Sequence, residues 1–324
     1  MKSPSGQGQA SKVRTLEKYD FDSLRKRGGK VSEIIIGCPD ALRDTGCLRQ
    51  GLPEVELRRK SVRGRQGIDF ESKQFSFESE GKRITGMINY RLGKKSPAVV
   101  MIRGYVDKEG YYSGSGTWRV ADELAKMGLI TVSIDFLGFG GSDGESVDML
   151  EARFEKVPAV MDLIASVKAL DFVDAEKIGI WAHSNGGQVA LSVLEILGER
   201  IPTVLWAPMT NPFPESVLET ADDLDDGGRA VRWAIEEFEK KYDSRRYAFE
   251  NYYDWVEAPI LINQGTGDYW CKLDWQVKVI EELTKRGKQA SLRVWPGDDH
   301  NLSKNWEEAV GEDMVFFSLN FFGN

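Results

Sequence analysis

The chain has 324 residues, of which 41% are hydrophobic and 29% are charged. This composition is ordinary for a globular protein and excludes a mainly disordered or collagen-like chain. The 51 acidic residues outnumber the 43 basic ones and give a net charge of −8. That balance argues against nucleic acid as a partner, because proteins that bind it usually carry a basic surface.

The counts of histidine and cysteine limit the chemistry. His183 and His300 are the only histidines, so a site built on three histidines is excluded. Three cysteines form neither a disulfide framework nor a four-cysteine zinc site. Cys38 and Cys47 are near enough in sequence for a local disulfide, but unpaired thiols are the commoner arrangement, so we expect a cytoplasmic protein. The alternative is a secreted or anchored form that has lost its leader, since residues 1–14 contain no apolar signal sequence.

Residues 1–66 are interpreted as an N-terminal extension ahead of a catalytic domain at residues 67–324. The extension is charge-rich and irregular, with an apolar run at residues 34–36 and a basic stretch at residues 58–65. The basic stretch is interpreted as a solvated linker, with an anion- or membrane-binding patch as the alternative. No segment approaches the roughly 18 apolar residues of a membrane helix, so we expect no membrane span.

From residue 67 onward, strand and helix patterns alternate. Phe75 and Phe77 alternate with polar residues, and the alternation resumes after residues 80–81 as far as Tyr90, which predicts a β-hairpin. Apolar runs predict buried strands at residues 98–104, 129–136, 177–182, 203–208, 258–265 and 291–297. Helical spacing of apolar residues predicts helices at residues 120–127, 160–170, 187–197 and 306–321. The chain is therefore predicted to be an α/β protein with a mainly parallel central sheet and helices on both faces, in which ligands bind beyond the carboxyl ends of the strands.

The third of the buried strands runs into the segment AHSNGG, residues 182–187. This is the G-x-S-x-G pattern of a nucleophile elbow, with Ala182 in place of the first glycine. Small residues two positions before and after Ser184 let the strand and the following helix pass closely. Ser184 is therefore the candidate nucleophile, with a tight turn that only caps the helix as the alternative.

A serine hydroxyl is a weak nucleophile and needs a neighbouring base. His183 lies inside the elbow, where its side chain should diverge from the serine hydroxyl, so we expect it to support the loop or line a pocket. His300 follows the last predicted strand and is the candidate base. Its alternative is an ordinary exposed loop histidine.

The base needs a carboxylate to orient it. Asp268 lies in the loop after the strand at residues 258–265 and gives the order serine, aspartate, histidine. Asp274 is the nearest rival, while Asp298 and Asp299 lie too close to the histidine in sequence for easy geometry. Asp268 could alternatively serve only as a turn or cap residue.

Acyl transfer also needs hydrogen-bond donors aimed at the developing oxyanion. One donor should be the backbone N–H of Asn185, the residue after the nucleophile. The backbone N–H of Tyr105, in the loop after the first buried strand, is the second candidate. The Tyr105 side chain either reaches the pocket or packs against its neighbours.

These motifs resemble the catalytic domain of the prolyl oligopeptidase family, within the α/β-hydrolase superfamily, over residues 68–322. The segment DFLGFGGSDG at residues 135–144 resembles a family motif, with Leu137 where arginine is usual. GTGD at residues 265–268 matches the family's aspartate loop imperfectly, and Arg103 stands where the family often has histidine. The resemblance implies an α/β-hydrolase fold with a triad of Ser184, Asp268 and His300, and no metal or cofactor.

Residues 208–257 form an insertion longer than a minimal fold needs, which we interpret as a small helical lid with a helix near residues 229–241. The pocket candidates are Arg103, His183, Trp206, Phe213 and Trp270. Trp206 and Phe213 are expected to face the acyl pocket, and Trp270 to line its mouth. The alternative is that the aromatic residues only pack the lid onto the core.

The family's peptidases usually carry a β-propeller, for which 66 residues are too few. We therefore expect a serine esterase acting on small aryl or alkyl esters, with feruloyl esterase-like activity among the options. A peptidase or amidase of prolyl oligopeptidase type, acting on short peptides, is the second hypothesis. An inactive hydrolase fold used as a binding protein is the third, and the oligomeric state stays open.

Overall fold

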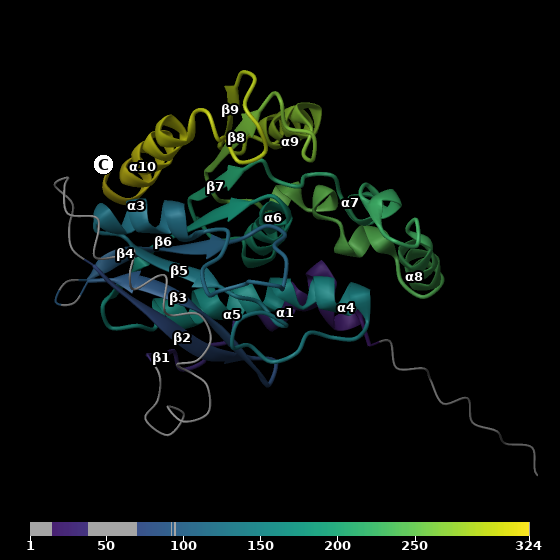
Figure 1. Cartoon of the computed structure of the whole chain (residues 1–324), viewed down its shortest axis with the longest axis horizontal. Coiled ribbons are helices and arrows are strands. Elements are labelled where there is room, and N and C mark those ends of the chain that lie inside the picture. Colours follow the sequence, from purple (N-terminus) through teal and green to yellow (C-terminus); the bar gives the residue numbers. More distant parts are fainter. Residues whose placement is uncertain (1–14, 38–69, 92, 94, 324) are drawn as a thin grey trace, which may run out of the picture.

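The computed structural model describes residues 15–37, 70–91, 93 and 95–323 (Figure 1). Cys38, Cys47 and the basic stretch at residues 58–65 lie outside the described residues, so what we inferred about them stays a prediction. Within the described part, no helix combines the length and apolar character that a membrane crossing requires.

A nine-stranded sheet lies at the centre of the described structure, in the spatial order β1-β2-β3-β5-β4-β6-β7-β8-β9. Neighbouring strands are parallel from β5 across to β9, and β1, β2, β3 and β5 pair antiparallel. The strands are β1 (Ile35–Ile36), β2 (Glu71–Ser79), β3 (Lys82–Tyr90), β4 (Ser96–Ile102), β5 (Ile130–Ile134), β6 (Val173–His183), β7 (Thr203–Trp206), β8 (Ile260–Gly265) and β9 (Ala290–Trp295). This mostly parallel sheet confirms the predicted fold class.

The predicted hairpin is formed by β2 and β3. Their register pairs Phe77 with Ile84 and Phe75 with Gly86. A side chain at Gly86 is excluded, because its Cβ would lie 2.2 Å from the carbonyl oxygen of Ser133 and 2.5 Å from the Phe75 ring. The glycine therefore lets β3 lie between the β2 aromatic ring and β5.

Helices cover both faces of the sheet, as predicted (Figure 1). The helices of the described residues are α1 (Phe21–Arg27), α3 (Trp118–Lys126), α4 (Met149–Phe154), α5 (Lys156–Lys168), α6 (Asn185–Leu197), α7 (Glu215–Leu218), α8 (Arg229–Glu239), α9 (Leu273–Lys285) and α10 (Trp306–Phe322). In β4, Val100 joins the apolar cluster that contains residues of α1, α5, α6 and α9, whereas Val99 and Met101 join the cluster with α3 and α10. This division follows from the two-residue period of a strand.

Residues 15–37 pack onto the rest of the chain, although the sequence reads as irregular there. Phe21 and Leu24 of α1 are buried in the same cluster as α5 and α6. Arg27 forms an ion pair with the buried Asp162 of α5, at 2.6 Å. Sequence periodicity missed α1 because a helix of seven residues offers only two buried apolar positions.

The insertion at residues 208–257 contains α7, α8 and short 3₁₀ helices at η3 (Ala221–Asp223), η4 (Ser244–Tyr247), η5 (Phe249–Asn251) and η6 (Tyr253–Trp255). Its aromatic rings pack onto α4: Phe213 and Tyr247 have ring centroids 5.2 and 5.0 Å from that of Phe154. These contacts fix where the insertion lies beside α4. Its function as a lid stays a prediction.

Candidate active site

The turn between β6 and α6 holds Ser184 in a conformation that side chains rarely adopt, with φ 55° and ψ −124°. The crossing is tight on both sides. A Cβ on Gly186 would lie 2.5 Å from the carbonyl oxygen of Ile102, and one on Gly187 would lie 2.3 Å from the Cβ of Pro208. These glycines are therefore needed to seat the turn, while Ala182 is accommodated at the first small position.

Hydrogen bonds hold the backbone of Ser184 in this conformation. Its N–H donates to the carbonyl of Trp206 at 3.0 Å, and its own carbonyl accepts from the N–H groups of Gly187 and Met209, each at 2.9 Å. The loop after β4 presses against the other side, since a Cβ on Gly104 would lie 2.7 Å from the Ser184 Cβ. Strained backbone that is over-determined in this way is typical of functional sites.

Asp268 and His300 come from the loops after β8 and β9 and form a direct pair. Nδ1 of His300 lies 2.8 Å from Oδ2 of Asp268. The other carboxylate oxygen accepts from the N–H groups of Trp270 and Cys271, at 2.8 and 3.0 Å. Burial alone would raise the pKa of Asp268, but the hydrogen bonds from His300 and Cys271 outweigh it and lower that pKa. The carboxylate is therefore ionised, so Nδ1 carries the proton and donates.

His183 lies behind the base. Its Nε2 is 3.0 Å from the carbonyl oxygen of His300, and the centroids of the two imidazole rings are 4.7 Å apart. Burial, together with repulsion from His300, lowers the pKa of His183 to about 4. A neutral ring whose Nε2–H donates to the His300 backbone positions that loop.

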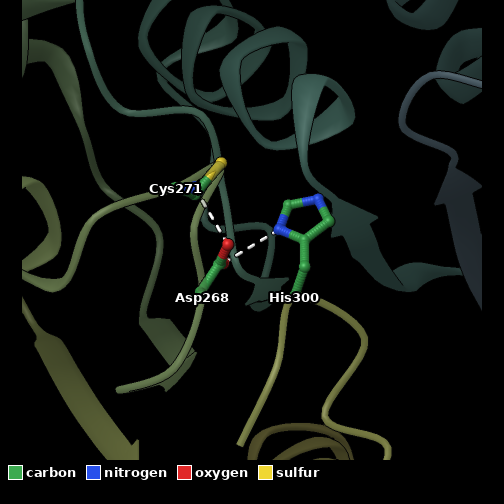
Figure 2. Close-up of side chains that lie close together, drawn as sticks. All are labelled: Asp268, Cys271 and His300. Atoms are coloured by element: carbon green, nitrogen blue, oxygen red, sulfur yellow. Dashed lines mark hydrogen bonds and ion pairs between the residues drawn. The ribbon is translucent and has the colours of Figure 1, made fainter.

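Figure 2 shows Cys271 beside the Asp268–His300 pair, on the loop that leaves β8. One ligand atom from each of the three residues lies within 4.8 Å of the others, as a metal site would require. Burial and the nearby Asp268 raise the pKa of the Cys271 thiol, and a protonated thiol is a poor metal ligand. The thiol instead interacts with the Ser184 hydroxyl, which places the serine next to the aspartate loop.

A cavity of about 110 Å³ lies next to the first turn of α6, where Asn185 and Gly186 line it, whereas Ser184, Asp268 and His300 are not among its lining residues. Two of the predicted pocket residues line it, Arg103 and Phe213, and so do the two residues predicted to supply oxyanion donors, Tyr105 and Asn185. Asn185 is the first residue of α6, and the first N–H groups of a helix have no partner within it. The side chain of Tyr105 is 76% exposed at the cavity rim.

The other three predicted pocket residues lie elsewhere. Trp206 was expected at the acyl pocket, but its indole is buried and donates to Asp313 of α10, at 2.8 Å. The reason is strand parity, which turns alternate residues of β7 toward α3 and α10, away from the cavity. Trp270 is half-exposed against Tyr269, and His183 supports His300.

Sequence reasoning missed several residues that line the cavity, above all Arg153 at the end of α4, Lys156 at the start of α5, and Tyr19. No local signal marks them, because charged residues at a helix end are ordinary in sequence. Their position depends on how α4, α5 and the N-terminal segment pack together.

Comparisons with known proteins identify the family and the fold of the chain. A model of the prolyl oligopeptidase family matches residues 117–323. Among solved structures, Est1E from Butyrivibrio proteoclasticus, determined with ferulic acid bound, is 20% identical with a TM-score of 0.57, over 77% of this chain and 99% of Est1E. The acylaminoacyl peptidase of Pyrococcus horikoshii is 18% identical with a TM-score of 0.58, over 82% of this chain and 42% of the peptidase. A puromycin-hydrolyzing peptidase from Mycobacterium tuberculosis is 13% identical with a TM-score of 0.59, over 78% of this chain and 40% of that one.

No curated protein sequence matches the chain. At these identities the solved structures establish a shared fold, that of the α/β hydrolases, and the family match covers well over half of the chain. The chain belongs to the prolyl oligopeptidase family of serine hydrolases.

Proposed function

We propose that the protein hydrolyses carboxylic esters through an acyl-enzyme, with Ser184 as nucleophile, His300 as base and Asp268 as the residue that orients the base. The observation that carries this proposal is the 2.8 Å pair of His300 Nδ1 and Asp268 Oδ2 beside a strained serine turn. That pair leaves the Nε2 edge of His300 free of the carboxylate, on the far side of the ring in Figure 2.

In the proposed reaction, the Ser184 oxygen attacks the ester carbonyl while its proton passes to Nε2 of His300. Asp268 stabilises the imidazolium that forms. The C–O bond to the alcohol then breaks, and the alcohol leaves with that proton. Water attacks the acyl-serine by the same route, and the carboxylic acid leaves as Ser184 regains its proton.

The backbone N–H groups of Asn185 and Tyr105 are proposed to hold the oxyanion. The N-terminus of α6 adds a favourable dipole at that position. Removing one oxyanion donor typically lowers kcat by about 10²- to 10³-fold, but backbone donors cannot be deleted by substitution. Replacing Gly104 with alanine tests the same loop, because the added Cβ would lie 2.7 Å from the Cβ of Ser184 and would displace the loop.

Esters are favoured because the likeness to Est1E extends over 99% of that protein, whereas the likeness to the acylaminoacyl peptidase covers 42% of its length. A peptidase or amidase of prolyl oligopeptidase type is the second candidate, since the family model carries that activity in its name. Values of kcat/KM for a matched ester and anilide separate the two. Esters are intrinsically more reactive than anilides. The esterase is supported if the ratio of kcat/KM for the ester to kcat/KM for the anilide exceeds this intrinsic difference in reactivity.

Replacing Ser184 with alanine removes the nucleophile and should lower kcat for a phenyl ester by about 10⁴-fold or more. His300→Ala should act similarly, because His183 is the only other imidazole and already donates to the His300 backbone. The exposed Ser291 of β9 supplies a control, Ser291→Ala, which should keep wild-type turnover. Turnover near wild type by Ser184→Ala, or failure of the folded wild type to react with a fluorophosphonate probe, would reject the mechanism.

A further inference from the structure

The cavity beside Ser184 carries an excess of positive charge. Three of its lining residues are cationic, Arg103, Arg153 and Lys156, and the described residues that line it include no aspartate or glutamate. They come from three places in the chain: the end of β4, the last turn of α4 and the first turn of α5. The N-terminus of α6 also opens onto the cavity and adds positive potential.

Lys156 is the least satisfied of the three. Within the described part of the chain its ammonium forms no hydrogen bond or ion pair, and its Nζ lies 5.8 Å from the centroid of the Phe136 ring. Burial, with repulsion from Arg153 and Arg103, lowers the pKa of Lys156 to about 8. Lys156 is half-buried, and a cation that is partly removed from water without a partner is stabilised when an anion pairs with it.

Arg153 is held only by neutral groups. Its Nη2 donates to the side-chain oxygen of Gln188 and to the hydroxyl of Ser216, the latter at 3.0 Å. Burial lowers the pKa of Arg153 to about 10, which still leaves it charged at neutral pH. The Arg153 guanidinium is therefore held in place at the cavity in its charged form, and no carboxylate among the described residues pairs with it.

Arg103 is fixed in the same way. It is 6% exposed, and its two terminal nitrogens donate to the carbonyls of Gly104 and Asp135, at 2.9 and 3.0 Å. Its buried Nε has no hydrogen-bond partner among the described residues. The guanidinium carbon lies 4.0 Å from the centroid of the Phe139 ring, which holds the group in place.

The acidic residues near this cluster already have other partners. Glu155 pairs with Lys82 at 3.0 Å, and Glu145 pairs with Lys108 at 2.5 Å. The carboxylate of Asp135 accepts hydrogen bonds from the hydroxyls of Ser113, Thr85 and Tyr111, at 2.6, 2.7 and 2.8 Å. Among the described residues, none of these carboxylates therefore forms an ion pair with Arg103, Arg153 or Lys156.

We propose that this cavity binds an anionic group of the substrate, so that the enzyme prefers esters bearing a carboxylate close to the scissile bond. Guanidinium and ammonium groups pair strongly with carboxylates in sites shielded from water. Gly104 and Asn185 line the same cavity, and a Cβ on Gly104 would lie 3.3 Å from the Ser184 hydroxyl, so an anion bound there lies close enough to Ser184 to be part of the ester that it attacks. The preference for hydrolysing such esters rests on the proposed function.

Two phenyl esters of the same shape test the preference. One is phenyl hydrogen glutarate, and the other carries an isopropyl group where glutarate has its free carboxylate. We expect the wild type to have a kcat/KM at least tenfold higher for the anionic ester, corresponding to one charge-assisted contact. Equal values, or a preference for the neutral ester, would overturn the proposal.

Lys156→Met keeps the length of the side chain and removes its charge. It should lower the ratio of anionic to neutral kcat/KM by about tenfold, and Lys156→Arg should restore most of it. The exposed Lys278 of α9 supplies the matched control, Lys278→Met, which should leave the ratio unchanged. Equal losses in both methionine variants would assign the effect to overall charge and reject the cavity. Circular dichroism and Tm confirm that each variant is folded.

The same ratio should depend on pH. The charges that act on Lys156 are those of Arg153 and Arg103, which lower its pKa, and of Glu145 and Glu155, which raise it. With its pKa at about 8, Lys156 loses its charge as the pH rises through that value. The preference for the anionic ester should therefore fall between pH 7 and pH 9 in the wild type, and should not fall in Lys156→Arg.

Calorimetry of free glutarate binding separates this proposal from the proposed function. We expect glutarate to bind the wild type at least tenfold more tightly than it binds Lys156→Met. If neither ester is hydrolysed but glutarate binds in this way, the anion site stands and the esterase fails. If the neutral ester is hydrolysed and glutarate does not bind, the esterase stands and the anion site fails.

Discussion

His183 contacts the backbone of His300, the proposed base, through its side chain. Its ring is neutral at physiological pH because its pKa is about 4, and its Nε2–H donates to the His300 carbonyl. The arrangement resembles the second layer of hydrogen bonds that orients the ligands of a metal site, applied here to a proposed base. A loop histidine gains a defined orientation only when both its side chain and its backbone are held.

His183→Phe should therefore lower kcat about fivefold with little change in KM, because one neutral hydrogen bond is worth about 1 kcal/mol and His183 is not among the residues that line the cavity. His183→Gln keeps an N–H donor and should recover part of the loss. Initial-rate kinetics on a phenyl ester above pH 5 measure both, since His183 is neutral throughout that range. An unchanged kcat in His183→Phe would show that the contact has no positioning role.

At the scale of elements, α1 is a structural part of the domain that follows it in sequence. Asp20 caps the helix by accepting from the N–H of Ser23 at 2.7 Å, and Leu24 is 2% exposed against the residues of α5 and α6. Tyr19 and Phe21 also reach the cavity lining. The N-terminal segment therefore contributes both to the core and to one wall of the candidate site.

Leu24→Ala should reduce the free energy of unfolding by about 2–5 kcal/mol, the usual cost of truncating a buried leucine. Val31 lies in the same segment and is 68% exposed, so Val31→Ala should change the free energy of unfolding by about 0.5 kcal/mol or less. Urea unfolding of both variants makes the comparison. Equally small effects would mean that the segment is a detachable extension.

At the scale of the whole molecule, Asp313 joins the C-terminal helix α10 to three strands of the sheet. Its carboxylate accepts from Trp181 of β6, Trp206 of β7 and Asn263 of β8, at 3.0, 2.8 and 2.9 Å. Burial raises the pKa of Asp313, and these three hydrogen bonds oppose the rise. One side chain thus satisfies three buried donors at once.

Asp313→Ala should lower the free energy of unfolding by about 3 kcal/mol or more, because it leaves three buried donors without a partner. The neighbouring Glu312 pairs with Arg293 at the surface, so Glu312→Ala should cost about 1 kcal/mol or less. Thermal unfolding followed by circular dichroism compares the two. A loss for Asp313→Ala no larger than that of Glu312→Ala would show that the donors find other partners.

The amino-acid sequence by itself determined what depends on local pattern. The periods of apolar residues specified the strands and helices, since each period reflects the geometry of one element. The elbow spacing predicted the turn at Ser184, and the order of the loops placed Asp268 and His300 after adjacent strands. Parallel strands end at one edge of the sheet, so those loops had to meet.

Only the tertiary structure decided which face each side chain occupies and what lines the cavity. Trp206 faces α10 and Phe213 reaches the cavity because strand parity and the packing of the insertion are set by distant contacts. Arg103 was predicted at the pocket, but its convergence with Arg153 and Lys156 was not, because the three residues are separated along the chain and meet only through packing. The negative net charge even pointed the other way, since an average over 324 residues says nothing about a single cavity.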